Sequence, residues 1–145
     1  MTNSTPHLIY FSSVTENTKI FVEQLEFQHT RLPLRAGDEA VIADRPYVLV
    51  VPTYGGGRDE ALVPKQVMRF LKDPEHRRLC VGIIGAGNLN FGDKYAAAAD
   101  LLSSKLHVPV LARFELRGMK SDRDTITQGL KNNWEKLLEL RGLTD

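Results

Sequence analysis

Residues 12–18 gather hydroxyl and amide side chains that could bind a phosphate group. The stretch reads SSVTENT and passes directly into a segment in which apolar residues recur at helical spacing. Hydroxyl groups, free backbone N–H groups at a helix start and the positive end of the helix dipole can together hold a dianion without a lysine. An ordinary Ser/Thr helix cap is the structural alternative. The side chains expected at the phosphate are those of Ser12, Ser13, Thr15, Asn17 and Thr18.

Two later loops combine glycines with uncharged polar and aromatic residues. They read PTYGGG at 52–57 and GAGNLNFG at 85–92, and they hold six of the 11 glycines. Glycine lets the backbone approach a flat ligand closely, and an aromatic side chain can stack on it. Tyr54 and Phe91 are the stacking candidates, although Tyr54 could instead lie in a flexible turn and Phe91 could plug its loop against the core. The residues expected to flank a planar ring are Thr53, Tyr54, Gly55, Gly56 and Gly57 on one side and Asn88, Leu89, Asn90, Phe91 and Gly92 on the other.

The second glycine loop does not match a dinucleotide-binding fingerprint. Gly85 and Gly87 begin a G-x-G-x-x-G spacing, but its last position is Asn90. Lys105 and Leu106 stand where the fingerprint places an acidic residue, so an NAD site is rejected. A phosphate at the first loop and a hydrogen-bonding ring between the other two together describe flavin mononucleotide (FMN).

Short apolar runs alternate with longer segments of helical period, which predicts βα units around a parallel sheet. Runs at 8–11, 47–51, 79–84 and 110–114 have the length and composition of strands buried on both faces, and a weaker strand is expected near 30–32. Ligands bind such sheets beyond the carboxyl ends of the strands, and each candidate loop directly follows one of these runs. The predicted fold class is therefore α/β, with helices on both faces of a five-stranded sheet.

The helices are predicted from their apolar spacing and their capping residues. Segments at 16–25, around 63–71, at 93–106 and near the carboxyl end are expected to be helical. Pro64 suits a first-turn position, and Ser121 with Asp124 reads as a capping box for the last helix. The apolar stripe of that helix, which makes Trp134 a core residue, consists of Ile126, Leu130, Trp134, Leu137 and Leu138. Residues 33–46 read as irregular.

Composition argues against several functional classes. The 145 residues include 19 basic and 18 acidic ones, for a net charge of +1, so neither nucleic acid nor an acidic membrane surface is indicated as a partner. No stretch reaches membrane-spanning length and the amino terminus does not read as a signal peptide, so we expect one cytoplasmic domain over residues 1–145. The single cysteine, Cys80, lies in an apolar run and is expected to be buried and inert. Four scattered histidines are assigned no catalytic role: His7, His29, His76 and His107.

Five sequence blocks resemble those of the NrdI family, the flavodoxin-like activators of class Ib ribonucleotide reductase. They are YFSSVTENT at 10–18, VPTYGGG at 51–57, VPKQVMRFL at 63–71, GNLNFG at 87–92 and RFELRGMKSD at 113–122. The first block is similar to the flavodoxin phosphate loop, with Glu16 where flavodoxins commonly carry glycine. The resemblance spans nearly the whole chain and implies a doubly wound, flavodoxin-like parallel sheet with strand order 2-1-3-4-5.

By this resemblance the chain binds FMN and partners the small, metal-carrying subunit of the reductase. The reduced flavin would supply electrons, or superoxide or hydroperoxide made from O₂, to assemble the dimanganese-tyrosyl radical cofactor of that subunit. O₂ is thus a possible acceptor, and the upstream reductant is of unknown identity. Because the sequence shows no reactive cysteine and no metal-ligand cluster, the redox chemistry is expected to reside on FMN, with no catalytic side chain and no metal. Whether the chain is itself an enzyme stays open.

Rival functions differ in the residues that they require. A receiver domain needs an aspartate where Pro52 and Thr53 stand, and a low-molecular-weight phosphatase needs a cysteine and an arginine in the first loop. A small quinone reductase needs a nicotinamide site, which the sequence does not show. A general flavodoxin-type one-electron carrier and a cofactor-free interaction module remain as alternatives. Since 53–57 and 85–92 contain no acidic residue, unlike the surroundings of a typical flavodoxin ring, the second reduction step is expected at a higher potential.

Overall fold

The computed structural model describes residues 5–13, 15–35, 37–53, 63–87 and 97–143. Strands and helices alternate along most of this length. In chain order they are β1 His7–Tyr10, α1 Asn17–Glu23, β2 Gln28–Arg31, β3 Tyr47–Pro52, α2 Lys65–Phe70, α3 Pro74–Leu79, β4 Cys80–Gly87, α4 Ala97–Leu106, β5 Val110–Glu115 and α5 Lys120–Leu140.

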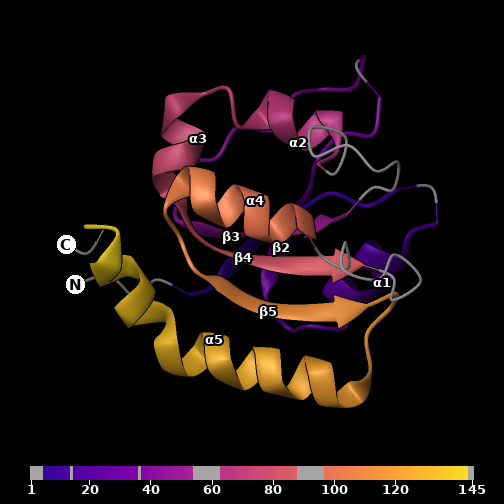
Figure 1. Ribbon diagram of the computed structural model, residues 1–145, viewed down its shortest axis with the longest axis vertical. Coiled ribbons are helices and arrows are strands. Elements are labelled where there is room, and N and C mark those ends of the chain that lie inside the picture. Colours follow the sequence, from indigo (N-terminus) through magenta and orange to yellow (C-terminus); the bar gives the residue numbers. More distant parts are fainter. Residues whose placement is uncertain (1–4, 14, 36, 54–62, 88–96, 144–145) are drawn as a thin grey trace.

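The five strands form one parallel sheet in the order β2-β1-β3-β4-β5 (Figure 1). This confirms the predicted fold class, the strand count and the strand order. The weak second strand lies at 28–31 rather than 30–32, in register with β1 from His7 opposite Gln28 to Tyr10 opposite Arg31. Because all strands run the same way, their carboxyl ends meet at one edge of the sheet, where the three candidate loops begin.

Helices cover both faces of the sheet, as predicted. One core joins α1 and α5 to the sheet, and the other joins α2, α3 and α4 to its opposite face. Strand β3 shows why its sequence is a continuous apolar run: Val48 and Val50 belong to the first core, whereas Leu49 and Val51 belong to the second. The predicted stripe of α5 is buried in the first core, Trp134 included.

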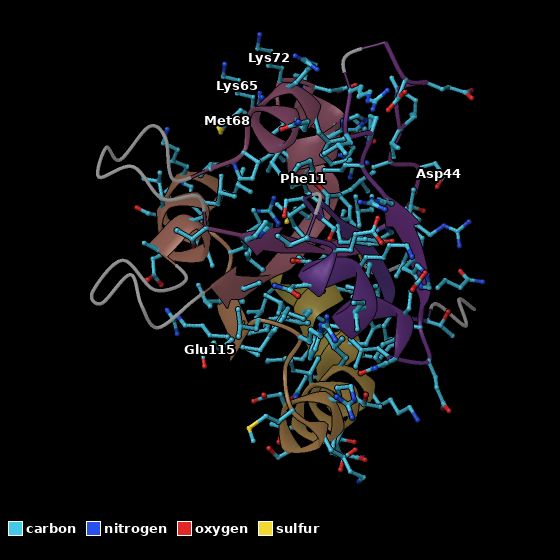
Figure 2. The ribbon with its side chains drawn as sticks, turned by 90° about the vertical axis from the view of Figure 1, so that its right-hand side faces the viewer. Phe11, Asp44, Lys65, Met68, Lys72 and Glu115 are labelled. Carbon is cyan, nitrogen blue, oxygen red and sulfur yellow. The ribbon has the colours of Figure 1, made fainter. Side chains whose placement is uncertain are left out.

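The outer face of α2 contrasts with this interior. Lys65, Met68 and Lys72 point outward from the region of α2, whereas Phe11 lies at the centre of the molecule (Figure 2).

Within the described residues, no helix is long and apolar enough to cross a bilayer.

Two predicted helix starts are wrong in detail. Helix α5 begins at Lys120, so Ser121 already lies in its first turn and cannot cap it. The Asp122 carboxylate accepts the Met119 N–H at 2.8 Å instead, while Asp124 pairs with Lys120. Pro64 is the residue before α2 rather than a first-turn residue.

Two further boundaries differ from the sequence-based prediction. Helix α3 was not predicted, although its start carries a readable signal: the Asp73 carboxylate accepts the Glu75 N–H at 2.9 Å, and Pro74 follows the cap. Helix α4 is seen from Ala97, and residues 93–96 of the predicted 93–106 helix lie outside the described part of the chain.

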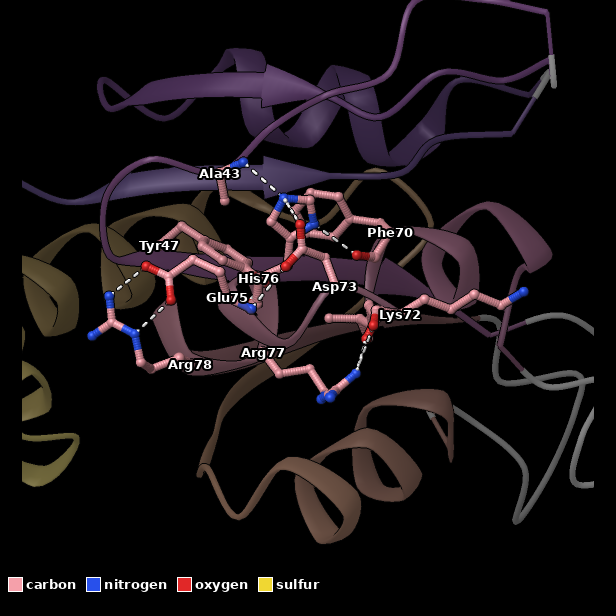
Figure 3. Close-up of polar contacts among 10 residues, drawn as sticks. Ala43, Tyr47, Phe70, Lys72, Asp73, Glu75, His76, Arg77 and Arg78 are labelled. Carbon is pink, nitrogen blue, oxygen red and sulfur yellow. Dashed lines mark hydrogen bonds and ion pairs between the residues drawn. The ribbon is translucent and has the colours of Figure 1, made fainter.

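The irregular crossover at 33–46 is fastened to the rest of the fold by His76 (Figure 3). The buried imidazole donates from Nδ1 to the Phe70 carbonyl at 2.7 Å and accepts the Ala43 N–H on Nε2 at 3.2 Å. Its ring stacks on Phe70, and the Tyr47 hydroxyl donates to the His76 carbonyl at 2.6 Å. The bond to Ala43 anchors the crossover, and the contacts with Phe70 and Tyr47 hold His76 in place, so His76 has a structural role.

Candidate cofactor site

The loop between β1 and α1, residues 11–16, is organised around Ser12. The Ser12 side chain is 1% exposed, and its Oγ accepts the Lys19 N–H at 3.0 Å. Glu16, the residue before α1, makes no side-chain cap of its own. Ser12 therefore accepts a hydrogen bond from a free N–H of the first turn of α1. This is the helix-capping role named above as the alternative to phosphate binding. Because Ser12 is almost fully buried, its hydroxyl supports the loop rather than facing solvent.

The other predicted phosphate residues take distinct positions around this loop. The Ser13 and Thr15 hydroxyl oxygens lie 2.9 Å apart in the exposed part of the loop, while Val14 between them lies outside the described residues. Asn17 is half-buried at the start of α1, and Thr18 beside it is buried. The structure thus brings together two accessible hydroxyls and the opening turn of a seven-residue helix.

Glu16 has a left-handed backbone conformation, with φ 63° and ψ 16°. Its N–H donates to the Ser13 carbonyl and its carbonyl accepts the Ile20 N–H, both at 2.9 Å, so the turn of the loop and the start of the helix meet at this residue. A left-handed conformation costs a residue with a side chain on the order of 1 kcal/mol relative to glycine. The place where flavodoxins commonly carry glycine is therefore strained here.

Two arginines flank the loop, and sequence analysis did not identify either. Arg31, at the end of β2, donates to the Ser12 carbonyl at 3.1 Å and lies 3.6 Å from the Glu16 carboxylate. Arg117, from the loop between β5 and α5, donates to the Asn17 side-chain oxygen at 3.4 Å. Pairing of β2 with β1 brings Arg31 beside Tyr10, at the start of the loop, so a correct strand order could have identified Arg31. Nothing in the sequence indicates that Arg117 contacts Asn17.

This set of groups fits a phosphate. The Ser13 and Thr15 hydroxyls share one hydrogen bond and leave one O–H free to donate outward, and the cations of Arg31, Arg117 and Lys19 outnumber the neighbouring carboxylates of Glu16 and Glu23. An excess of positive charge beside the loop favours the binding of a dianion. The described loop therefore suits the dianionic end of FMN.

Thr53 stands where the first glycine loop begins, and its side chain faces a helix. It is 6% exposed, its Oγ1 accepts the Ala98 N–H at 3.0 Å, and its N–H donates to the Ala86 carbonyl at 3.0 Å. Thr53 thus ties the end of β3 to β4 and to the start of α4. The remaining residues predicted to flank the ring lie outside the described residues: Tyr54, Gly55, Gly56, Gly57, Asn88, Leu89, Asn90, Phe91 and Gly92.

Other reactive groups in the described part of the chain do not form a second centre. Cys80 is buried as predicted, and burial raises the pKa of its thiol to about 11, which keeps it protonated. Among the described residues there is no group of three or more side chains that could hold a metal ion.

Comparison with protein families assigns most of the chain to one family. The family model described as "NrdI Flavodoxin like" matches residues 9–128. Protein NrdI of Rhodococcus erythropolis is 47% identical over 135 residues, which cover 90% of this chain and 85% of that protein. Protein NrdI of an Enterobacter species is 47% identical over 129 residues, covering 89% and 94%. Protein NrdI of Mycoplasma pneumoniae is 46% identical over 134 residues, covering 91% and 87%.

Solved structures show the same fold at low sequence identity. A short-chain flavodoxin associated with a bacterial microcompartment superposes with a TM-score of 0.58 at 13% identity, covering 92% of this chain and 99% of that one. The two-electron reduced flavodoxin of Megasphaera elsdenii superposes with a TM-score of 0.57 at 16% identity, covering 87% and 98%. The family match and the relatives together establish that this chain belongs to the NrdI flavodoxin-like family, FMN proteins required for assembly of the class Ib ribonucleotide reductase cofactor.

Proposed function

We propose that the chain, as one domain, holds FMN by its phosphate in the β1–α1 loop and by its ring between the loops that follow β3 and β4. The observation that carries this proposal is the pair of Ser13 and Thr15 hydroxyls in the exposed part of a loop that Arg31 contacts at Ser12 and Arg117 contacts at Asn17. Ser12 accepts the Lys19 N–H, Thr18 is buried at the start of α1, and Asn17 links the loop to Arg117. The ring is assigned to 53–57 and 88–92 from their sequence.

We further propose that the protein serves the small subunit of class Ib ribonucleotide reductase as a source of oxidant. When bound, FMN supplies the redox chemistry, so that electrons from an upstream reductant reach O₂ and yield superoxide or hydroperoxide for the dimanganese-tyrosyl radical site. The residues of this chain bind and orient the cofactor. Family membership supports this assignment, and we propose that the protein works beside the reductase in the cytoplasm.

The phosphate assignment is tested with Thr15→Val, which keeps the shape of the side chain and removes its hydroxyl. Loss of one hydrogen bond to a charged group costs roughly 1.5 to 3 kcal/mol, or about tenfold or more in FMN affinity. Riboflavin, which lacks the phosphate, should bind both proteins alike. Thr125→Val on the exposed side of α5 is the matched control and should leave both affinities unchanged. Equal FMN affinity in parent and Thr15→Val would remove Thr15 from the site.

The partner assignment is tested with the reduced holoprotein and a manganese-loaded class Ib small subunit. Tyrosyl radical should appear only when O₂ is supplied, and scavenging superoxide and peroxide in the bulk solution should leave most of the yield, because the oxidant passes within the complex. Leu89→Asp in the second glycine loop should lower the radical yield more than FMN affinity. Radical formation without O₂, or none with it, would favour a general one-electron carrier.

The absence of acidic residues from 53–57 and 85–92 predicts the redox behaviour. A like charge about 5 Å from the ring costs on the order of 3 kcal/mol at an effective dielectric constant near 20. Without that repulsion, the second electron should enter at a higher potential than in an acidic flavodoxin. An anaerobic redox titration measures this directly, and a very low second potential with slow reoxidation by O₂ would contradict the proposal.

A further inference from the structure

We propose that Arg31 is a positioning residue that holds the β1–α1 loop in the shape needed for phosphate binding. This inference rests on the proposed function, because it assumes that the loop binds the FMN phosphate. It assigns a role in cofactor binding to an edge strand that contributes none of the predicted site residues.

Arg31 joins two separate parts of the loop. One guanidinium nitrogen, Nη2, donates to the Ser12 carbonyl at 3.1 Å, and the other, Nη1, lies 3.6 Å from Glu16 Oε1. The backbone of Arg31 is fixed by pairing with Tyr10, immediately before the loop, and the N–H of Leu32 donates to the Tyr10 carbonyl at 2.7 Å. The forked guanidinium group of Arg31 therefore extends from a fixed strand and contacts the loop both where it begins, at Ser12, and where it ends, at Glu16.

The contact with Glu16 matters because of the backbone at that residue. Glu16 is left-handed without being glycine, so its conformation needs support from its surroundings. Two side chains give this support. One is Arg31 on β2, and the other is Lys19 on α1, whose ammonium lies 3.8 Å from the second oxygen of the Glu16 carboxylate. Lys19 lacks the second link, because its ammonium contacts Glu16 and Glu23 and not the Ser12 carbonyl.

An exposed ion pair alone contributes little, and the Arg31 and Glu16 side chains are 28% and 47% exposed. The structural claim therefore rests on the fork, which binds carbonyl and carboxylate together, rather than on charge. A lysine at position 31 would keep the charge and lose the fork. Arg31→Lys therefore distinguishes two explanations: positioning of the loop, which needs both nitrogens of the guanidinium group, and electrostatic attraction of the phosphate, which needs only the charge.

Binding measurements on the apoprotein, with FMN and riboflavin as ligands, test the proposal. Arg31→Met should lower FMN affinity about tenfold and change riboflavin affinity by less than about twofold, since only FMN carries the phosphate. Arg31→Lys should resemble Arg31→Met. Lys19→Met, the matched removal of a neighbouring charge, should cost about threefold or less. If Arg31→Lys binds FMN like the parent, or Lys19→Met loses as much as Arg31→Met, attraction explains the data and the proposal is overturned.

A double-mutant cycle with Glu16→Gly sharpens the test. Glycine adopts the left-handed conformation without strain, so the loop should need Arg31 less. In that background Arg31→Met should cost only about threefold or less, the value of an ordinary exposed contact. An undiminished tenfold loss would mean that Arg31 acts on the phosphate directly, which refutes positioning.

Hydrogen exchange in the FMN-free protein gives a readout that does not depend on the cofactor. The Lys19 and Ile20 amides are bonded to Ser12 Oγ and to the Glu16 carbonyl, so Arg31→Met should speed their exchange. The Leu130 amide in α5 should be unaffected, which shows that the variant is folded. Failure of the parent to bind FMN would refute the proposed function, whereas unchanged Lys19 and Ile20 exchange would refute the role of Arg31.

Discussion

Gly118 occupies a position where even one methyl group should be costly. Its φ is +72°, and a Cβ built on it would lie 2.5 Å from Phe21 Cδ1 and 2.7 Å from Phe21 Cε1. Phe21 cannot retreat, because its ring is fully buried and stacks on Phe114 with centroids 3.7 Å apart. The backbone strain of a left-handed alanine costs about 1 to 2 kcal/mol, and forcing a methyl group into a packed core adds about 1 to 3 kcal/mol.

We therefore expect Gly118→Ala to lower the free energy of unfolding by about 2 to 5 kcal/mol. Denaturant titration followed by far-UV circular dichroism measures this. Gly142→Ala is the matched control, because Gly142 has a similar φ of +68° with nothing within 4 Å of its would-be Cβ. Gly142→Ala introduces only the backbone strain. The difference in unfolding free energy between the two variants therefore measures the clash with Phe21.

A third variant checks the assignment of that clash. In the Gly118→Ala background, Phe21→Leu should cost less than it does in the parent, because the shorter side chain also makes room for the methyl group. If Gly118→Ala and Gly142→Ala lose the same stability within about 0.5 kcal/mol, the steric reasoning fails.

Three further predictions concern stability. Gly129→Ala should raise the free energy of unfolding by about 0.5 to 1 kcal/mol in a denaturant titration, because Gly129 lies within α5 and has open space where its Cβ would be. Tyr47→Phe should lower it by about 1 to 3 kcal/mol, because the buried His76 carbonyl loses its hydroxyl donor; no loss would mean that water replaces that donor. Burial, then Arg45, lowers the pKa of His7, so the unfolded chain binds the proton more readily and stability should fall as the pH drops below about 6.5. His7→Gln should flatten this decline in thermal melts across pH, and an unchanged slope would assign it to other groups.

The sheet was predictable because its inner strands, β1, β3 and β4, are almost wholly buried, whereas the edge strands β2 and β5 are only partly buried. Continuous apolar runs, such as Tyr47–Pro52, leave few alternatives to a parallel sheet covered by helices, and all five strands were located. Element ends were less predictable, because capping depends on local geometry. The Asp122 carboxylate, rather than that of Asp124, accepts a backbone N–H at the start of α5. Residue spacing alone does not show which of the two aspartates does so.

The candidate site was predictable in its hydroxyl groups and not in its cations. Ser12, Ser13 and Thr15 follow a predicted strand directly, so one local rule locates them. Arg31 comes from β2 and Arg117 from the loop after β5, and their contacts exist only once the topology has formed. The hydroxyl of Thr53 faces Ala98 rather than open space, which sequence alone could not show because α4 follows 45 positions later.

The bond between Asn17 and Arg117 spans 100 positions, which has a consequence for folding. The β1–α1 loop is synthesised early, but its partners on β3 and in the loop after β5 follow much later. Contacts with such large sequence separation form late, because the chain entropy of closing the loop must be overcome first. The proposed phosphate site is therefore complete only when nearly the whole domain has been made. We therefore expect FMN to bind at the proposed site after the sheet has formed.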